Sequence, residues 1–167
     1  MKTHAILLFA LLFSAPALAA VTPNNIITPQ TPKLGLAQFL PASTPGTYLT
    51  VYTAGASGSD IRSLWLDTND TATHVVTCQI VCGASDSGCT NTLKYGGITI
   101  TSTAGAGSQA FALPQDMLTP AVWPGLMRDT DGNPYIRLNV TDTLQCTYAT
   151  AVTASDQVDI HAIGVDY

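Results

Sequence analysis

The sequence predicts an all-β protein, an antiparallel β-sandwich of the jelly-roll or Ig-like kind with an extended N-terminal arm. Short runs of alternating residues are rich in Thr, Val, Ile and aromatic side chains, which favour strands. Clusters of Gly, Asn, Asp and Pro separate these runs and are typical of tight turns. The eleven acidic residues are all Asp, and Asp favours turns where Glu would favour helix. Seven or so strands joined by turns are therefore expected.

Residues 1–19 have the pattern of a secretory signal peptide. Lys2 supplies the positive charge, residues 5–13 are apolar, and Ala17-Leu18-Ala19 is a small-x-small cleavage signal. The apolar run is shorter than a bilayer span requires, although a retained signal-anchor is an open alternative. We expect export to the periplasm, the cell surface or the medium, with membrane contact only through this segment. Removing 19 of the 167 residues would leave 148, enough for one domain.

Residues 20–46 are expected to form a Pro-rich extended arm ahead of a β-sandwich domain at 47–167. Five prolines in this segment exclude a helix and disfavour a central strand. Four apolar residues nevertheless occur in its second half, and we expect them to pack against the sandwich or a neighbouring subunit. These interface candidates are Leu34, Leu36, Phe39 and Leu40. A loose linker is the alternative, chiefly for residues 21–33.

Seven strands are expected in the domain, at residues 47–53, 61–67, 74–82, 93–101, 135–140, 143–149 and 157–165. Residues 114–118 are interpreted as one helical turn. Because side chains alternate between the two faces of a strand, one set of alternate residues should form the core. The predicted core includes Val51, Leu64, Leu66, Val76, Ile80, Ile136, Leu138, Leu144, Ile160 and Ala162.

Four cysteines, Cys78, Cys82, Cys89 and Cys146, indicate two disulfides if the chain is exported. Three pairings are possible. A Cys82–Cys89 bond would close the loop-forming segment between them, and Cys78 would then pair with Cys146. A zinc site is the rival interpretation, but the spacing matches no common zinc pattern.

No catalytic constellation is recognisable, and we predict that the protein is not an enzyme and has no cofactor or metal. His74 and His161 are far apart in sequence and lie in no local nucleophile motif. The run from Asp129 to Asn133 resembles the start of an EF-hand loop, but its twelfth position is Val140 rather than Glu. A looser calcium site built from several loops stays open.

Ligand binding is a second possibility. Trp65 and Trp123 could stack on sugars, although such residues more often fill cores or interfaces. Asp129 and Asp131 are further ligand-binding candidates, but turn residues are the simpler interpretation. The formal charge of −5 argues against nucleic acid as a partner, which needs a basic surface.

Four segments together resemble a group of small proteins encoded by tailed bacteriophages and prophages. The segments are ITPQTPKLGLAQFL (27–40), YTAGASGSDIRSLWLDTNDTATH (52–74), PAVWPGLMRDTDGNPYIRL (120–138) and DTLQCTYATAVTASDQVDIHAIGVDY (142–167). The resemblance implies a virion structural component, such as a head-decoration-like or tail-associated β-sandwich. The signal peptide and the cysteines around Cys82 depart from the usual form of the group, which suggests an exported variant.

The expected function is therefore structural and non-enzymatic: self-association, or decoration of a capsid, tail or cell-surface lattice. Extended arms suit assembly because they can add a strand to an exposed sheet edge. The alternative is an exported carbohydrate- or cell-surface-binding module. The expected location is outside the cytoplasm, or in a virion if the protein is a phage component.

Overall fold

A computed structural model describes residues 30–84, 86, 89, 93–108 and 110–167. The predicted signal peptide and the first part of the predicted arm lie outside these residues. Ten strands and no helix occur in the described part, so the all-β prediction is confirmed. Within it, no helix is long and apolar enough to cross a membrane.

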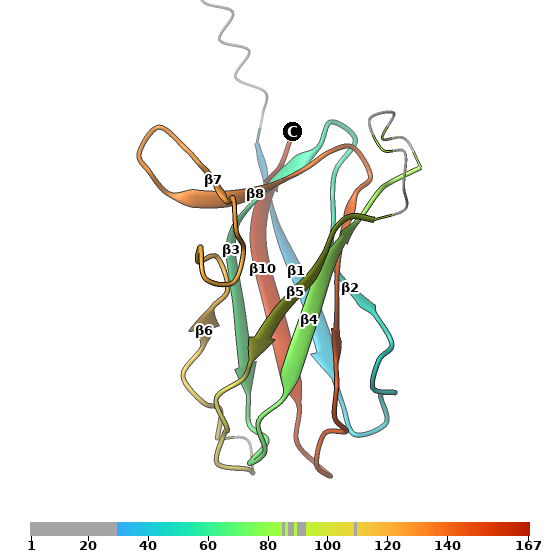
Figure 1. The fold of residues 1–167 in the computed structure, drawn as a ribbon, viewed down its shortest axis with the longest axis vertical. Coiled ribbons are helices and arrows are strands. Elements are labelled where there is room, and N and C mark those ends of the chain that lie inside the picture. Colours follow the sequence, from blue (N-terminus) through green and yellow to red (C-terminus); the bar gives the residue numbers. More distant parts are fainter. Residues whose placement is uncertain (1–29, 85, 87–88, 90–92, 109) are drawn as a thin grey trace, which may run out of the picture.

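The strands form two antiparallel sheets packed face to face (Figure 1). The first sheet has the order β1 (Thr31–Phe39), β10 (Val158–Asp166), β3 (Ser59–Thr68), β8 (Pro134–Leu138) and β7 (Met127–Arg128), with β6 (Gln115–Asp116) also on β3. The second has the order β2 (Leu49–Thr53), β9 (Thr143–Tyr148), β4 (Val75–Val81) and β5 (Leu93–Thr101).

The strand pairing is that of a jelly roll. The first long strand pairs with the last, β1 with β10, and β2 pairs with β9, the last but one. The series continues inward with β3 on β8 and β4 on β5. The chain is therefore a long folded hairpin that is rolled up into two sheets, the arrangement of the double-sheet jelly rolls.

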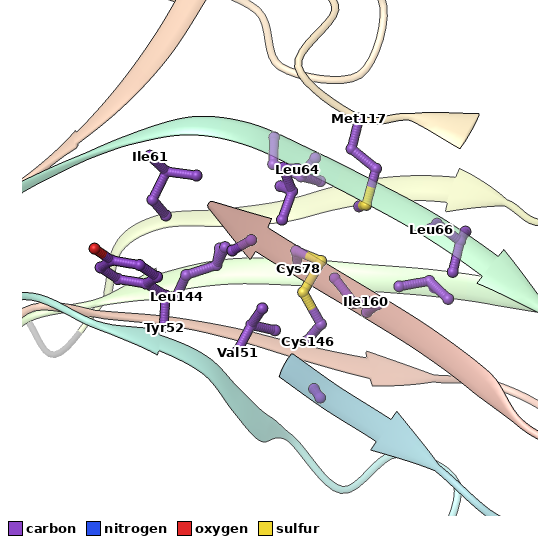
Figure 2. Close-up of a cluster of buried hydrophobic side chains, with 14 of the residues drawn as sticks. Val51, Tyr52, Ile61, Leu64, Leu66, Cys78, Met117, Leu144, Cys146 and Ile160 are labelled. Carbon is purple, nitrogen blue, oxygen red and sulfur yellow. A yellow bond between two sulfur atoms is a disulfide. The ribbon is translucent and has the colours of Figure 1, made fainter. Parts of the chain in front are cut away.

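The core lies between the sheets, and all ten predicted core residues are buried. Figure 2 shows side chains of β3 and β10 meeting those of β2, β4 and β9 across this space. The core also includes large side chains outside this set, each at most 2% exposed: Phe39, Tyr52, Ile61, Met117 and Tyr148. Side chains alternate between the two faces of a strand, so a strand with one apolar face turns that face towards the core.

The described part of the predicted arm is an edge strand of the sandwich. β1 pairs with β10 along its whole length, and Phe39 is buried in the core. Gly35 lies directly against β2 of the other sheet, because a Cβ built there would be 2.2 Å from the carbonyl oxygen of Val51. A side chain at position 35 would therefore force the two sheets apart along this edge.

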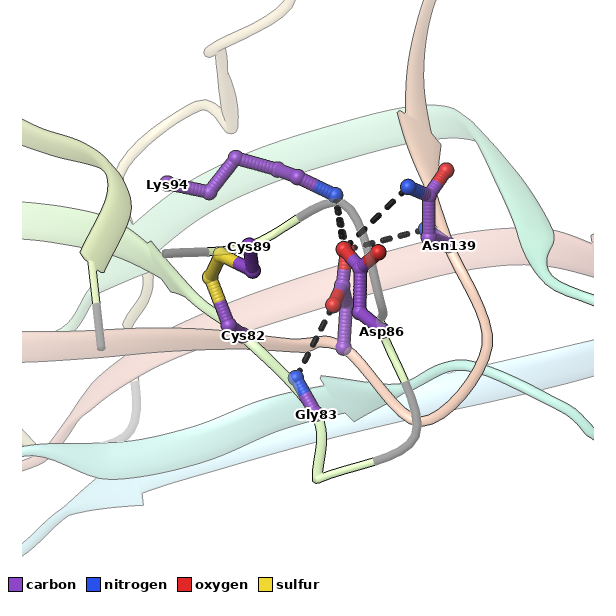
Figure 3. The surroundings of a disulfide bond; sticks show 7 residues. Cys82, Gly83, Asp86, Cys89, Lys94 and Asn139 are labelled. Carbon is purple, nitrogen blue, oxygen red and sulfur yellow. Dashed lines mark hydrogen bonds and ion pairs between the residues drawn. A yellow bond between two sulfur atoms is a disulfide. The ribbon is translucent and has the colours of Figure 1, made fainter. Parts of the chain in front are cut away.

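Two disulfides join Cys78 to Cys146 and Cys82 to Cys89. Cys78 and Cys146 are direct neighbours in register on β4 and β9, and both are fully buried. Figure 3 shows the second disulfide beside an ion-pair cluster. Lys94 contacts the carboxylates of Asp86 at 2.6 Å and Asp142 at 2.7 Å.

The helical turn predicted at residues 114–118 is wrong. Gln115 and Asp116 pair with β3, and the N–H of Met117 donates to the carbonyl oxygen of Leu64. The Met117 side chain is fully buried. Tertiary pairing and burial override a weak local helix tendency in a segment this short.

Candidate functional site

The outer face of the first sheet, which points away from the core, carries an ordered set of side chains. Three rows cross β1, β10 and β3 in register. The rows are Leu34–Ile163–Ser63, Leu36–His161–Trp65 and Gln38–Asp159–Asp67. We call these nine residues the outer face. One end of it is apolar and the other is acidic.

The apolar residues of the outer face lie on the edge strand β1 and on the adjacent part of β10. Leu34 is 77% exposed and Leu36 is 54% exposed, and Ile163 lies beside them at 39%. Among the described strands, none pairs with the other side of β1. An open edge strand presents unpaired N–H and C=O groups, so this edge can accept a further strand.

The acidic end brings together Asp67, Asp159 and His161. Their ligand-type atoms all lie within 4.8 Å of one another. His161 Nε2 is 3.5 Å from Asp67 Oδ1. The His161 ring stacks on Trp65, with centroids 5.1 Å apart and an interplanar angle of 12°. The stacking fixes the plane of the imidazole beside the two carboxylates.

The two carboxylates of this group are incompletely satisfied. Asp159 is 5% exposed, and its Oδ2 accepts a hydrogen bond of 2.6 Å from Gln157 Nε2. The Oδ1 atoms of Asp159 and Asp67 are buried, and within the described chain they have no hydrogen-bond partner. Burial raises the pKa of Asp67, and the Asp159 charge adds to this, while His161 opposes it.

His74 is not available for catalysis, because it is wholly buried. Its Nε2 donates to Asp70 Oδ2 at 2.9 Å, and its Nδ1 lies 3.1 Å from both the carbonyl and the hydroxyl of Thr150. Both ring nitrogens are therefore occupied by partners within the protein. His161 and His74 belong to different sites. The backbone N–H of His74 donates to Ser102 Oγ, but neither imidazole ring contacts a Ser or Cys side chain among the interactions of the described residues.

Trp123 lines a separate pocket of about 150 Å³. Its ring lies 5.9 Å from that of Tyr95, whose hydroxyl donates to the Pro124 carbonyl. Tyr135 and Arg137 also line the pocket. Trp123 Nε1 is buried and has no hydrogen-bond partner among the residues that the structure describes. Trp123 itself is 3% exposed and belongs to the core, so the aromatic surface that the pocket offers comes mainly from Tyr95 and Tyr135.

Asp129 and Asp131 lie in an exposed turn. Asp129 Oδ1 accepts the N–H groups of Asp131 and Asn133, and its Oδ2 is 2.8 Å from Arg62 Nη1. Hydrogen bonds from Asn133, against a small effect of desolvation, hold the pKa of Asp129 below its usual range. The first of these two candidates is thus already engaged in shaping the turn.

The structure distributes the predicted ligand-binding residues over three places: Trp65 on the outer face, Trp123 in the pocket, and Asp129 with Asp131 in the turn. The Asp67–Asp159–His161 group was not predicted. Alternation places Trp65 and Asp67 on one side of β3, and Asp159 and His161 on one side of β10. The pairing register of β3 with β10, which brings them together, has no local signal.

No family model matches the sequence, and no curated protein matches it. Two viral structures are among the solved structures that align with it, both at low TM-scores. A chain of the cyanophage Pam1 capsid asymmetric unit is 18% identical, with a TM-score of 0.37 over 81% of this chain and 84% of that one. A chain of the virus-like particle of extra small virus from the giant freshwater prawn Macrobrachium rosenbergii is 10% identical, with a TM-score of 0.34 over 100% and 96%. Neither likeness is close enough to carry a functional conclusion.

Proposed function

We propose that this protein is a non-enzymatic structural subunit that self-associates through the open edge of β1. The observation that carries the proposal is the nine-residue edge strand β1, whose outer side pairs with none of the described strands and which carries two exposed leucines. Monomeric proteins usually protect such edges with charges, prolines or bulges. Here Pro32 and Lys33 protect one end of β1, and the stretch from Leu34 to Leu36 has no such protection.

A second copy of the chain is the partner that fits this edge. If two β1 strands pair antiparallel around a two-fold axis at Gly35, Leu34 of one copy lies opposite Leu36 of the other. Residues opposite each other in an antiparallel pair point to the same face. Four leucines would then form one apolar strip across a continuous sheet, in the isologous manner of most dimers.

The wider role we propose is in a virion or on a bacterial surface, as a coat-like or decorating subunit. The jelly-roll fold occurs in viral capsid subunits, but also in lectins and cupins, so the fold alone supports this role only by analogy. The resemblance of four segments to tailed-phage virion proteins adds to it. The two disulfides favour assembly or residence in an oxidising compartment.

Light scattering coupled to gel filtration tests the self-association. The wild-type chain should show a mass above that of a monomer at micromolar concentration. Leu34→Ser should weaken association at least about tenfold, as expected for a central interface residue. Leu113→Ser is the matched control, because Leu113 is 88% exposed and outside the outer face. A monomeric wild-type chain up to 100 times that concentration, or equal effects of the two variants, would contradict the proposal.

The pocket at Trp123 supports a second candidate, a carbohydrate-binding module. Tyr95 and Tyr135 offer aromatic surfaces, and Lys94 and Arg137 offer polar groups at its margin. A glycan array probed with the wild-type chain and with Tyr95→Ala separates the two candidates. Binding of a glycan class that Tyr95→Ala abolishes would favour the module. The monomer–oligomer balance should not change in that variant.

A further inference from the structure

We infer that Asp67, Asp159 and His161 form a binding site for a divalent transition-metal cation on the outer face. This inference goes beyond self-association and does not depend on it. Two carboxylates and an imidazole are a ligand set of the type that Zn²⁺ accepts. The three side chains come from two adjacent strands, which hold their backbone atoms rigidly in register.

The spacing of the atoms fits a metal. A tetrahedral zinc ion with ligands at roughly 2.0–2.2 Å holds neighbouring ligand atoms about 3.3–3.6 Å apart. His161 Nε2 and Asp67 Oδ1 are already 3.5 Å apart. One ligand-type atom from each of the three side chains lies within 4.8 Å of the other two. The described residues supply three ligands, and solvent or a partner group would fill the fourth position.

Asp159 provides the independent indication that a cation is expected here. Its carboxylate is 5% exposed and leaves Oδ1 without a hydrogen-bond partner in the described part of the chain, within the same cluster. A buried, unpartnered carboxylate oxygen costs free energy unless a cation or a proton donor meets it. Among the ion pairs of the described residues, the basic side chain that reaches this cluster is His161, and it contacts Asp67 rather than Asp159.

The surroundings orient the ligands as metal sites usually require. Gln157 Nε2 holds Asp159 Oδ2, which leaves Oδ1 as the free ligand atom. Trp65 fixes the plane of the His161 ring by stacking. Outer groups of this kind set the orientation of the ligands, and their loss commonly weakens metal binding roughly 10- to 100-fold.

Isothermal titration of the untagged, chelator-treated chain with Zn²⁺ tests the site. One Zn²⁺ should bind per chain, and Asp159→Asn should weaken binding at least about tenfold, because a neutral amide replaces the ligand charge. Asp131→Asn is the matched control and should bind as the wild-type chain does, since Asp131 lies in the exposed turn.

Co²⁺ provides a spectroscopic readout at the same site. The wild-type chain should give a visible absorption band that His161→Gln alters or abolishes. The His161 side chain is 31% exposed, so this variant should fold even if Asp159→Asn does not. Absence of saturable Zn²⁺ binding by the wild-type chain, or equal affinity in both ligand variants and the control, would overturn the inference. If Leu34→Ser leaves the Zn²⁺ affinity unchanged, metal binding does not depend on self-association through β1.

Discussion

The imidazole of His74 donates to the carboxylate of Asp70 across 2.9 Å, and both side chains are completely buried. Asp70 also accepts the N–H groups of Ala72 and Thr153 and the hydroxyl of Thr153. Thr153 follows β9, whereas Asp70 follows β3, so this carboxylate joins two loops of the sandwich. Removing one partner would leave the other polar groups buried without compensation.

We therefore expect Asp70→Asn to lower the free energy of unfolding by about 3 kcal/mol at pH 7. Urea denaturation followed by tryptophan fluorescence measures it, with Asp131→Asn as a control that should change the value by less than about 0.5 kcal/mol. A change in Asp70→Asn no larger than in the control would show that the network adds little to stability.

The same pair predicts a pH dependence. Burial alone would raise the pKa of Asp70, but the hydrogen bonds from Ala72, Thr153 and His74 outweigh it and hold the pKa well below its usual range. Stabilisation from a lowered carboxyl pKa is complete above the unfolded value, about 3.9, and is lost as the pH falls towards the folded value. The stability difference between the wild-type chain and Asp70→Asn should therefore shrink as the pH falls below about 4. A constant difference between pH 7 and pH 2.5 would contradict this expectation.

The two disulfides should differ in their effect on stability. Cys78–Cys146 closes a sequence separation of 68 residues and Cys82–Cys89 a separation of 7. Chain entropy then gives about 4 kcal/mol for the first and about 2.5 kcal/mol for the second. Paired Cys→Ala variants, compared by urea denaturation, check the order. Equal losses of stability in the two variants would rule out the loop-length explanation.

Mass spectrometry of the oxidised and reduced wild-type chain should show a gain of four hydrogens on reduction, two for each disulfide.

Gly35→Ala should destabilise the sandwich edge. A Cβ at position 35 would meet the Val51 carbonyl oxygen at 2.2 Å, which is backbone and cannot move aside easily. We expect a loss of about 1–3 kcal/mol, the range for overpacked sites. Gly96→Ala is the control, because the nearest atom to its built Cβ is a Leu93 methyl carbon at 3.8 Å. Thermal unfolding of both variants tests this expectation. If Gly35→Ala unfolds at the same midpoint temperature as the wild-type chain, β1 and β2 can move apart without loss of stability.

The signal-peptide pattern of residues 1–19 predicts that the chain is exported and cleaved. Expressed with its full sequence in a bacterium that exports proteins, the chain should be cut after Ala19, because small residues occupy both positions of the cleavage signal. Intact-mass measurement of the periplasmic fraction should give a chain that begins at Ala20. Changing Ala17 and Ala19 to bulky residues should retain the precursor. An uncut chain found only in the cytoplasm would contradict export.

Local patterns in the sequence predict the fold class and ten of the core residues. Turn residues delimit the strands, and alternation identifies the inner face, as Leu64 and Leu66 on β3 or Ile160 and Ala162 on β10 illustrate. These signals are local, since they depend on the period of the backbone and on the solvation of each side chain. The sequence also predicts that residues 31–39 are extended, but Pro32 and the prolines on either side of the segment argue against the full edge strand that the structure contains.

Which strands pair, and in which register, depends on contacts across the whole sandwich and has no local signal. The register of β3 with β10 places His161 beside Trp65, and Asp159 beside Asp67, to form the metal-binding group that we propose. The position of β1 at the end of its sheet leaves Leu34 and Leu36 at an open edge. Each of these depends on contacts between residues about a hundred positions apart or more, and strand pairing at such separations is selected by the combined burial of both faces rather than by any local segment.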